Sequence, residues 1–150
     1  MHRRTAHIGA FALTLLIGLA LLAPSSASAI TRQEVMKRAN VWVKLNVPYS
    51  QSSYATVSGS VLSTTSPSTK GYRTDCSGFV SMSYALKTSR GLPLSLDTGS
   101  LPTRLVPIAK SQLLPGDVIL RPKNLRIDGK LVPSGHVVIF GGWTDSTKKT

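Results

Sequence analysis

The order of apolar and polar residues predicts two helices in the first part of the chain after residue 30. Apolar side chains recur at helical spacing over residues 31–46 and again over residues 75–87. At the start of the first segment, Thr31 and Glu34 have the spacing of a capping box, and Pro48 follows its end. We therefore expect two helices, each with one face turned to a core.

The rest of the chain carries strand patterns. Short apolar runs at 118–120 and 135–140 are bounded by Pro or Gly residues, as buried strands often are. Between them, Asp128 and Gly129 predict a tight hairpin within 127–132. Because the helices precede the strands and do not alternate with them, the pattern predicts an α+β domain with its N-terminal helices packed on a small antiparallel sheet.

A polar stretch lies between the two helical segments. Twelve of the 22 residues from 50 to 71 are Ser or Thr, and no apolar period runs through them. This composition predicts a long surface loop that leads to the second helix. A mucin-like linker is the alternative, but a linker separates two cores, and too few residues precede this one to form a core.

The first 29 residues have the layout of a secretory signal peptide. Arg3 and Arg4 precede an apolar run over residues 8–22, and small residues at 27–29 offer a cleavage site. The run of about 15 residues is shorter than the roughly 20 that span a bilayer, although a retained N-terminal anchor is the alternative. We expect a secreted single domain over residues 30–150, without stable membrane insertion after cleavage.

The chain is strongly basic, with a net charge of +12 at pH 7. Arg3 and Arg4 are the only charged residues of the first 29, so 16 Lys and Arg remain against 6 Asp and Glu. Such a surplus attracts polyanions, and outside a cell these are anionic wall polymers. A soluble basic surface without a specific partner is the alternative, because the charges are scattered. Nucleic acid is not an expected partner, since the basic stretches lack interleaved aromatic residues.

Cys76 is the only cysteine of the chain, and His136 is the only histidine after residue 29. A single thiol forms no internal disulfide, and the start of the expected helix favours a thiolate over a thiol. His136 begins an expected strand and has the side chain best suited to carry a proton near neutral pH. The alternatives are a buried, unreactive thiol and a structural histidine. No metal or cofactor is expected, because one Cys and one His make half a zinc site and a Cys-x-x-Cys motif is missing.

Three segments together resemble the signatures of the NlpC/P60 family of secreted cell-wall peptidases, over about residues 31–143. They are Asp75-Cys76-Ser77-Gly78-Phe79-Val80, Leu114-Pro115-Gly116-Asp117-Val118 and Gly135-His136-Val137-Val138-Ile139-Phe140. The resemblance implies a papain-like α+β fold and hydrolysis of peptide bonds in the stem peptides of peptidoglycan. It also implies that Cys76 is the nucleophile and His136 its base.

The same resemblance suggests further site residues. Tyr49 corresponds to a tyrosine beside the nucleophile that helps to hold substrate or the oxyanion, although a packed aromatic is an equal alternative. Asp75 and Ser77 resemble residues that contact a substrate amine, while helix capping alone would also explain Asp75. The family usually orients its histidine with a polar residue on the next strand, and Asp145 is the candidate here. The closing strands of the family fold are not found before residue 150, so we expect a C-terminally truncated domain.

The sequence thus predicts a secreted, cell-wall-associated cysteine endopeptidase or amidase, a peptidoglycan hydrolase that acts as a monomer without a cofactor. Its expected partners are peptidoglycan peptides and anionic wall polymers. One alternative is a catalytically degenerate, basic module that binds the wall. Another is a fragment that does not fold.

Overall fold

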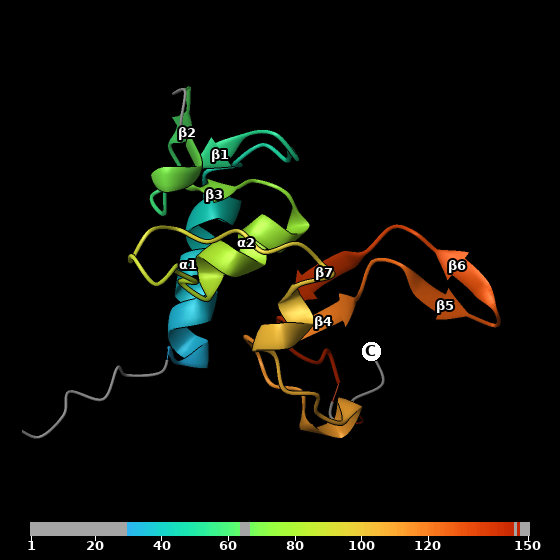
Figure 1. Cartoon of the computed structure of the whole chain (residues 1–150). Coiled ribbons are helices and arrows are strands. Elements are labelled where there is room, and N and C mark those ends of the chain that lie inside the picture. Colours follow the sequence, from blue (N-terminus) through green and yellow to red (C-terminus); the bar gives the residue numbers. More distant parts are fainter. Residues whose placement is uncertain (1–29, 64–66, 146, 148–150) are drawn as a thin grey trace, which may run out of the picture.

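The computed structural model describes residues 30–63, 67–145 and 147, and the expected signal peptide lies outside them. The described chain is α+β, with two helices and small antiparallel sheets (Figure 1). Its elements in chain order are α1 (Arg32–Lys44), β1 (Tyr54–Ala55), β2 (Val61–Leu62), β3 (Tyr72–Arg73), α2 (Cys76–Ser83), β4 (Val118–Arg121), β5 (Leu125–Ile127), β6 (Lys130–Val132) and β7 (His136–Ile139). Three short 3₁₀ helices lie at Pro67–Thr69, Leu101–Arg104 and Lys110–Gln112. None of the described helices is long and apolar enough to cross a membrane.

Helix α1 begins where the sequence predicts. The Thr31 hydroxyl oxygen accepts a hydrogen bond from the Glu34 N–H at 3.2 Å, while the Glu34 carboxylate lies 3.8 Å from the Lys37 ammonium group. The helix ends at Lys44, because Asn46 adopts a left-handed conformation at φ 50°. Its buried face carries Val35, Ala39 and Trp42.

Helix α2 is shorter than expected, and the prediction that it extends to residue 87 was wrong. It ends at Ser83, and Ala85 then turns the backbone to φ 54°. The hydroxyl groups of Ser81 and Ser83 donate to the carbonyl oxygens four residues earlier, at 2.7 and 2.9 Å. Serine hydroxyls that bond the backbone in this way weaken a helix slightly. The helix ends in a left-handed cap, in which the Ala85 N–H donates to the Met82 carbonyl oxygen at 3.0 Å and the Leu86 N–H donates to the Ser81 carbonyl oxygen at 2.9 Å.

The segment 50–71 is more ordered than a surface loop, so that prediction was incomplete. Strands β1 and β2 lie within it and form a three-stranded antiparallel sheet with β3, in the order β2-β1-β3. Strands β1 and β2 have two residues each, too few to show an alternating pattern in a Ser- and Thr-rich sequence. This sheet carries the chain into Asp75 and the start of α2.

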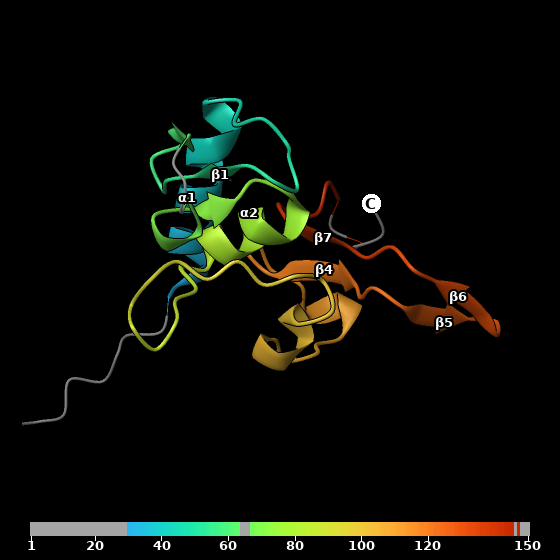
Figure 2. The same ribbon diagram turned by 45° about the horizontal axis from the view of Figure 1, so that its top comes forward.

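Strands β4 and β7 pair antiparallel, with Val118 opposite Ile139 and Arg121 opposite His136. Helix α2 packs directly against β7 and lies between α1 and the β4–β7 pair, as both views show (Figures 1 and 2). Val80 of α2, Leu101 and Val137 of β7 form a buried cluster at this contact. The predicted α+β class with antiparallel strands is therefore confirmed, although the described strands form three small sheets and not one.

Strands β5 and β6 form the hairpin that the Asp-Gly pair predicts. Asp128 and Gly129 have φ angles of 49° and 77°, and Ile127 pairs with Lys130. Positive φ at both central residues is the conformation of a type I′ turn. The hairpin projects away from the two helices in both views (Figure 2).

Candidate active site

The two residues expected to carry the chemistry line one cleft. Cys76 is the first residue of α2, and His136 is the first residue of β7. Because α2 packs on β7 through Val80 and Val137, residues 60 positions apart in sequence reach the same cleft of about 260 Å³. The lining residues are Trp42, Val43, Val47, Tyr49, Thr74, Asp75, Cys76, Phe79, His136 and Val137.

The thiol is accessible at the positive end of a helix. Cys76 is a free, half-buried cysteine in the first turn of α2. The first N–H groups of a helix have no acceptor within the helix, and they stabilise negative charge placed beside them. Asp75 accepts a hydrogen bond from one of them, the Gly78 N–H, at 2.8 Å. The histidine is exposed and lines the same cleft.

Asp75 belongs to a network with Arg73 and Ser77. Arg73 Nε donates to Asp75 Oδ2 at 2.7 Å, and Arg73 Nη2 donates to the Ser77 hydroxyl oxygen at 2.9 Å. That hydroxyl group in turn donates to Asp75 Oδ1 at 3.3 Å. Sequence analysis did not identify Arg73. Its position two residues before the capping aspartate, in the last strand before the helix, is the one signal that points to it.

Gly78 brings the start of α2 against β3. A Cβ atom at this position would lie 1.9 Å from the Arg73 carbonyl oxygen, closer than any side chain allows. The glycine in the Asp75–Gly78 segment is thus required for packing. It lets the strand that carries Arg73 reach the residues on either side of the nucleophile.

Aromatic side chains form part of the cleft. Tyr49 lines it and is 64% exposed, so this ring is not packed in the core. Trp42 and Phe79 lie in contact, with ring centroids 6.2 Å apart. The surface beside the thiol is therefore largely apolar and has one exposed phenol group.

Two predicted site residues lie outside the cleft lining. Ser77 is 2% exposed, and its hydroxyl group serves the network with Arg73 and Asp75. Asp145 accepts hydrogen bonds from the Thr147 N–H at 2.8 Å and from the Thr147 hydroxyl at 2.5 Å. A substrate contact by Ser77 and the orienting of His136 by Asp145 stay predictions.

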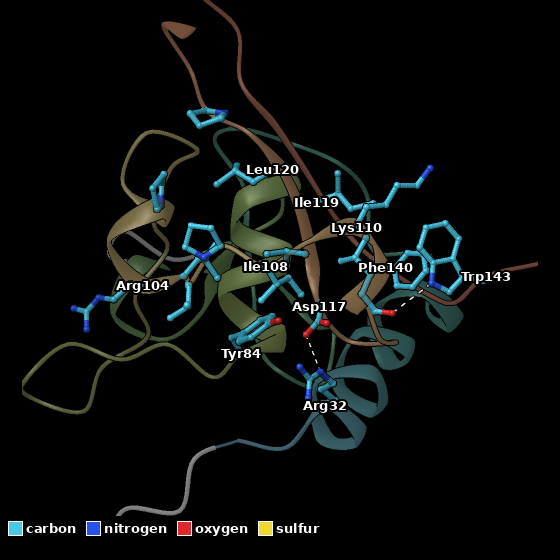
Figure 3. A pocket seen from close by; sticks show the side chains of 17 residues that line it. Arg32, Tyr84, Arg104, Ile108, Lys110, Asp117, Ile119, Leu120, Phe140 and Trp143 are labelled. Atoms are coloured by element: carbon cyan, nitrogen blue, oxygen red, sulfur yellow. Dashed lines mark hydrogen bonds and ion pairs between the residues drawn. The ribbon is translucent and has the colours of Figure 1, made fainter. Parts of the chain in front are cut away.

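A larger cavity of about 930 Å³ lies between β4 and the segment 102–113 (Figure 3). None of the predicted site residues lines it. Most of its wall is apolar, and Phe140 packs edge-on against Trp143 with centroids 4.9 Å apart. Arg32 and Asp117 form an ion pair at 2.7 Å at its lower end in Figure 3. The cavity contains no cysteine or histidine and is not the candidate active site.

The Asp117 carboxylate links α1 to the start of β4. Burial would raise its pKa, but hydrogen bonds from Arg32 and the Leu114 N–H outweigh burial, so the pKa lies below its usual value. A carboxyl group of this kind stabilises the fold above its unfolded pKa of 3.8, and the contribution is lost as pH falls through the folded pKa.

We expect Asp117→Asn to lower the free energy of unfolding by about 1 kcal/mol at neutral pH, because the exposed Arg32 limits the strength of the pair. The difference from the wild type should shrink as the pH falls below 3.8. Urea unfolding of both proteins at a series of pH values measures this difference in the free energy of unfolding. A difference that grows towards acid would contradict the assignment.

In the part of the chain that the structure describes, His, Cys, Asp and Glu residues form no group of three able to hold a metal ion. Comparison of the chain with protein-family models, curated proteins and solved structures found no match.

Proposed function

We propose that this chain is a secreted cysteine peptidase or amidase that hydrolyses peptide bonds in the stem peptides of peptidoglycan. The observation that carries the proposal is that Cys76, at a helix start, and His136, at a strand start, line the same accessible cleft. A thiol and a proton carrier that open onto one cleft, with the first N–H groups of a helix at the thiol, are the groups that acyl transfer needs. The order and spacing of the three NlpC/P60-like segments supply the substrate class.

The chemistry follows from these groups. His136 takes the thiol proton, and the Cys76 thiolate attacks the scissile carbonyl carbon. In this proposal the N–H groups at the start of α2 stabilise the oxyanion, and the Tyr49 hydroxyl, which belongs to the cleft lining, assists them. The imidazolium of His136 then protonates the leaving amine as the C–N bond breaks. Water hydrolyses the resulting thioester, which releases the acid and restores the thiol.

Defined muropeptides test the proposal. Residues 30–150 incubated with purified muropeptides should release products whose masses differ from the substrate by one hydrolysed peptide bond. Treatment with iodoacetamide should stop the release, because it alkylates the half-buried thiol of Cys76. If circular dichroism shows that the chain is folded, and the muropeptides are still intact after long incubation, the proposal is wrong.

A second candidate is a non-catalytic module that binds the cell wall. The observation in its favour is that four exposed basic residues lie on and beside the projecting hairpin: Arg121, Lys123, Arg126 and Lys130, of which Lys123 is paired with Asp97. We expect the protein to pellet with purified cell walls and to be released by salt, because exposed charges are screened. Replacing Arg126 and Lys130 by glutamine should weaken pelleting more than replacing Lys37 and Lys44. Pelleting without product release would favour this candidate over the peptidase.

A further inference from the structure

The β5–β6 hairpin carries apolar side chains that no other described element covers. Leu125, Ile127 and Leu131 are 37%, 45% and 54% exposed. Strands β5 and β6 pack on each other, and on no other described helix or strand to a comparable extent. Both views show the hairpin directed away from the helices (Figures 1 and 2). Apolar side chains gathered at one exposed place mark an interaction site.

The strand register places cations beside these apolar side chains. Residues directly opposite each other in an antiparallel pair share a face of the sheet. Ile127 lies opposite Lys130 on one face, and Arg126 lies opposite Leu131 on the other. Both cations are exposed, and the one carboxylate of the segment 121–135 is that of Asp128 in the turn. Each face of the hairpin therefore combines an apolar side chain with a positive charge.

We infer that this hairpin binds the surface of a bilayer that contains anionic lipids. In this docking the apolar side chains enter the boundary between head groups and acyl chains, and the cations lie against the anionic head groups. Buried apolar area and charge attraction both strengthen the binding. The hairpin joins β4 to β7, which begins at His136, so a docked hairpin tethers the candidate active site to the bilayer. The inference does not depend on peptidase activity.

Other occupants fit the hairpin less well. A hydrophilic wall polymer would use the cations but leave Ile127 and Leu131 without a role. Interfaces between proteins are depleted in lysine, and this hairpin presents Lys130. Its strands have three residues each and carry Arg126 or Lys130, and short charged strands are poor edges for pairing with a second copy of the chain. A lipid interface takes both kinds of side chain.

Sedimentation with lipid vesicles tests the inference. The protein is residues 30–150, which contain every described element and lack the apolar run of residues 8–22, a segment that would itself bind lipid. The vesicles contain phosphatidylglycerol and phosphatidylcholine in equal parts, or phosphatidylcholine alone. We expect the mixed vesicles to be bound at least about tenfold more tightly than the neutral ones, because each cation near an anionic surface contributes about fivefold.

Serine variants test the apolar contribution. Leu131→Ser and Ile127→Ser should each weaken binding to the mixed vesicles about fivefold, because a half-exposed apolar side chain no longer enters the interface. Val61→Ser is the matched control, since Val61 is 52% exposed but lies in β2, outside the hairpin. Binding by this control should equal that of the wild type.

Glutamine variants test the charge contribution. Replacing Arg126 and Lys130 together should weaken binding to the mixed vesicles about 25-fold. Replacing Lys37 and Lys44, which are exposed on α1, is the matched control and should weaken it less than about fivefold. The hairpin packs on no core element to a comparable extent, so all these variants should keep the circular dichroism spectrum of the wild type.

The outcomes separate this inference from the other proposals. Equal binding to both kinds of vesicle, binding to neither, or unchanged binding by both Leu131→Ser and Ile127→Ser would overturn it. Sedimentation with purified cell walls but not with vesicles would also overturn it and assign the hairpin to a wall polymer. Cys76→Ala should bind vesicles as the wild type does, because the thiol lies outside the hairpin. Failure of the peptidase proposal therefore leaves vesicle binding unchanged.

Discussion

Replacement of Cys76 by alanine is expected to abolish muropeptide cleavage, and His136→Gln is expected to lower kcat/KM by about 10²–10⁴-fold, the usual contribution of a general base. The two side chains line one cleft, and in the proposed reaction each needs the other for the first step. The double variant should therefore be no less active than Cys76→Ala alone, because residues that act as a unit have non-additive effects. The activities of the two single variants and the double variant are compared by initial rates of product release, with the products identified by mass spectrometry.

The controls for this experiment come from the same cleft. Cys76→Ala removes one partly exposed sulfur, so its thermal unfolding should stay close to that of the wild type. Tyr49→Phe keeps the ring and removes only the hydroxyl, and a loss in kcat with little change in KM would place that group at the oxyanion. Cleavage by Cys76→Ala at the wild-type rate would rule out the thiol as the nucleophile.

The largest loss of stability is expected from Trp42→Ala, about 3–5 kcal/mol in the free energy of unfolding. Trp42 is 3% exposed and packs in one cluster with Ala55, Tyr72 and Met82. Its indole Nε1 also donates to the Thr56 carbonyl oxygen at 2.9 Å, which joins α1 to the first sheet. Removal of the ring leaves both a cavity and an acceptor without its donor.

The second tryptophan of the chain is a matched control. Trp143 is partly exposed in the wall of the larger cavity, so Trp143→Ala should lower stability by clearly less than Trp42→Ala. Urea unfolding followed by circular dichroism compares the two, since fluorescence would change with either substitution. Equal losses would contradict the prediction that the buried ring of Trp42 contributes more to stability than the partly exposed ring of Trp143.

The elements with strong local signals were predicted from the sequence alone. Thr31 marked the start of α1, Asp75 the start of α2, and Asp128 with Gly129 the turn between β5 and β6. At the two helix starts, a short polar side chain accepts a hydrogen bond from a backbone N–H three residues later. In the turn, Asp and Gly adopt the positive φ angles that a two-residue hairpin loop requires. Each of these features can therefore be predicted from a few neighbouring residues. The first sheet was not predicted, because its strands have only two residues each, too few for a periodic pattern, and are held by pairing with one another in the order β2-β1-β3.

The early end of α2 escaped prediction for a different reason. Apolar spacing continues through Leu86, but the hydroxyl groups of Ser81 and Ser83 bond the backbone of the preceding turn. Leu86 then donates its N–H to the Ser81 carbonyl oxygen outside the helix. A hydrophobic pattern reports which side chains face a core, and it does not report which backbone conformation presents them.

The sequence alone determined the chemical identity of the candidate pair, since one cysteine and one histidine remain after residue 29. It also determined the caps and turns, because those depend on neighbours in the chain. The tertiary structure decided that the pair lines one cleft, through the packing of α2 on β7. It also decided that Asp75 is neutralised by Arg73, because that pairing depends on β3 lying against a glycine of α2. The contact between α2 and β7 is set by the packing of elements far apart in the chain, which no local sequence signal records.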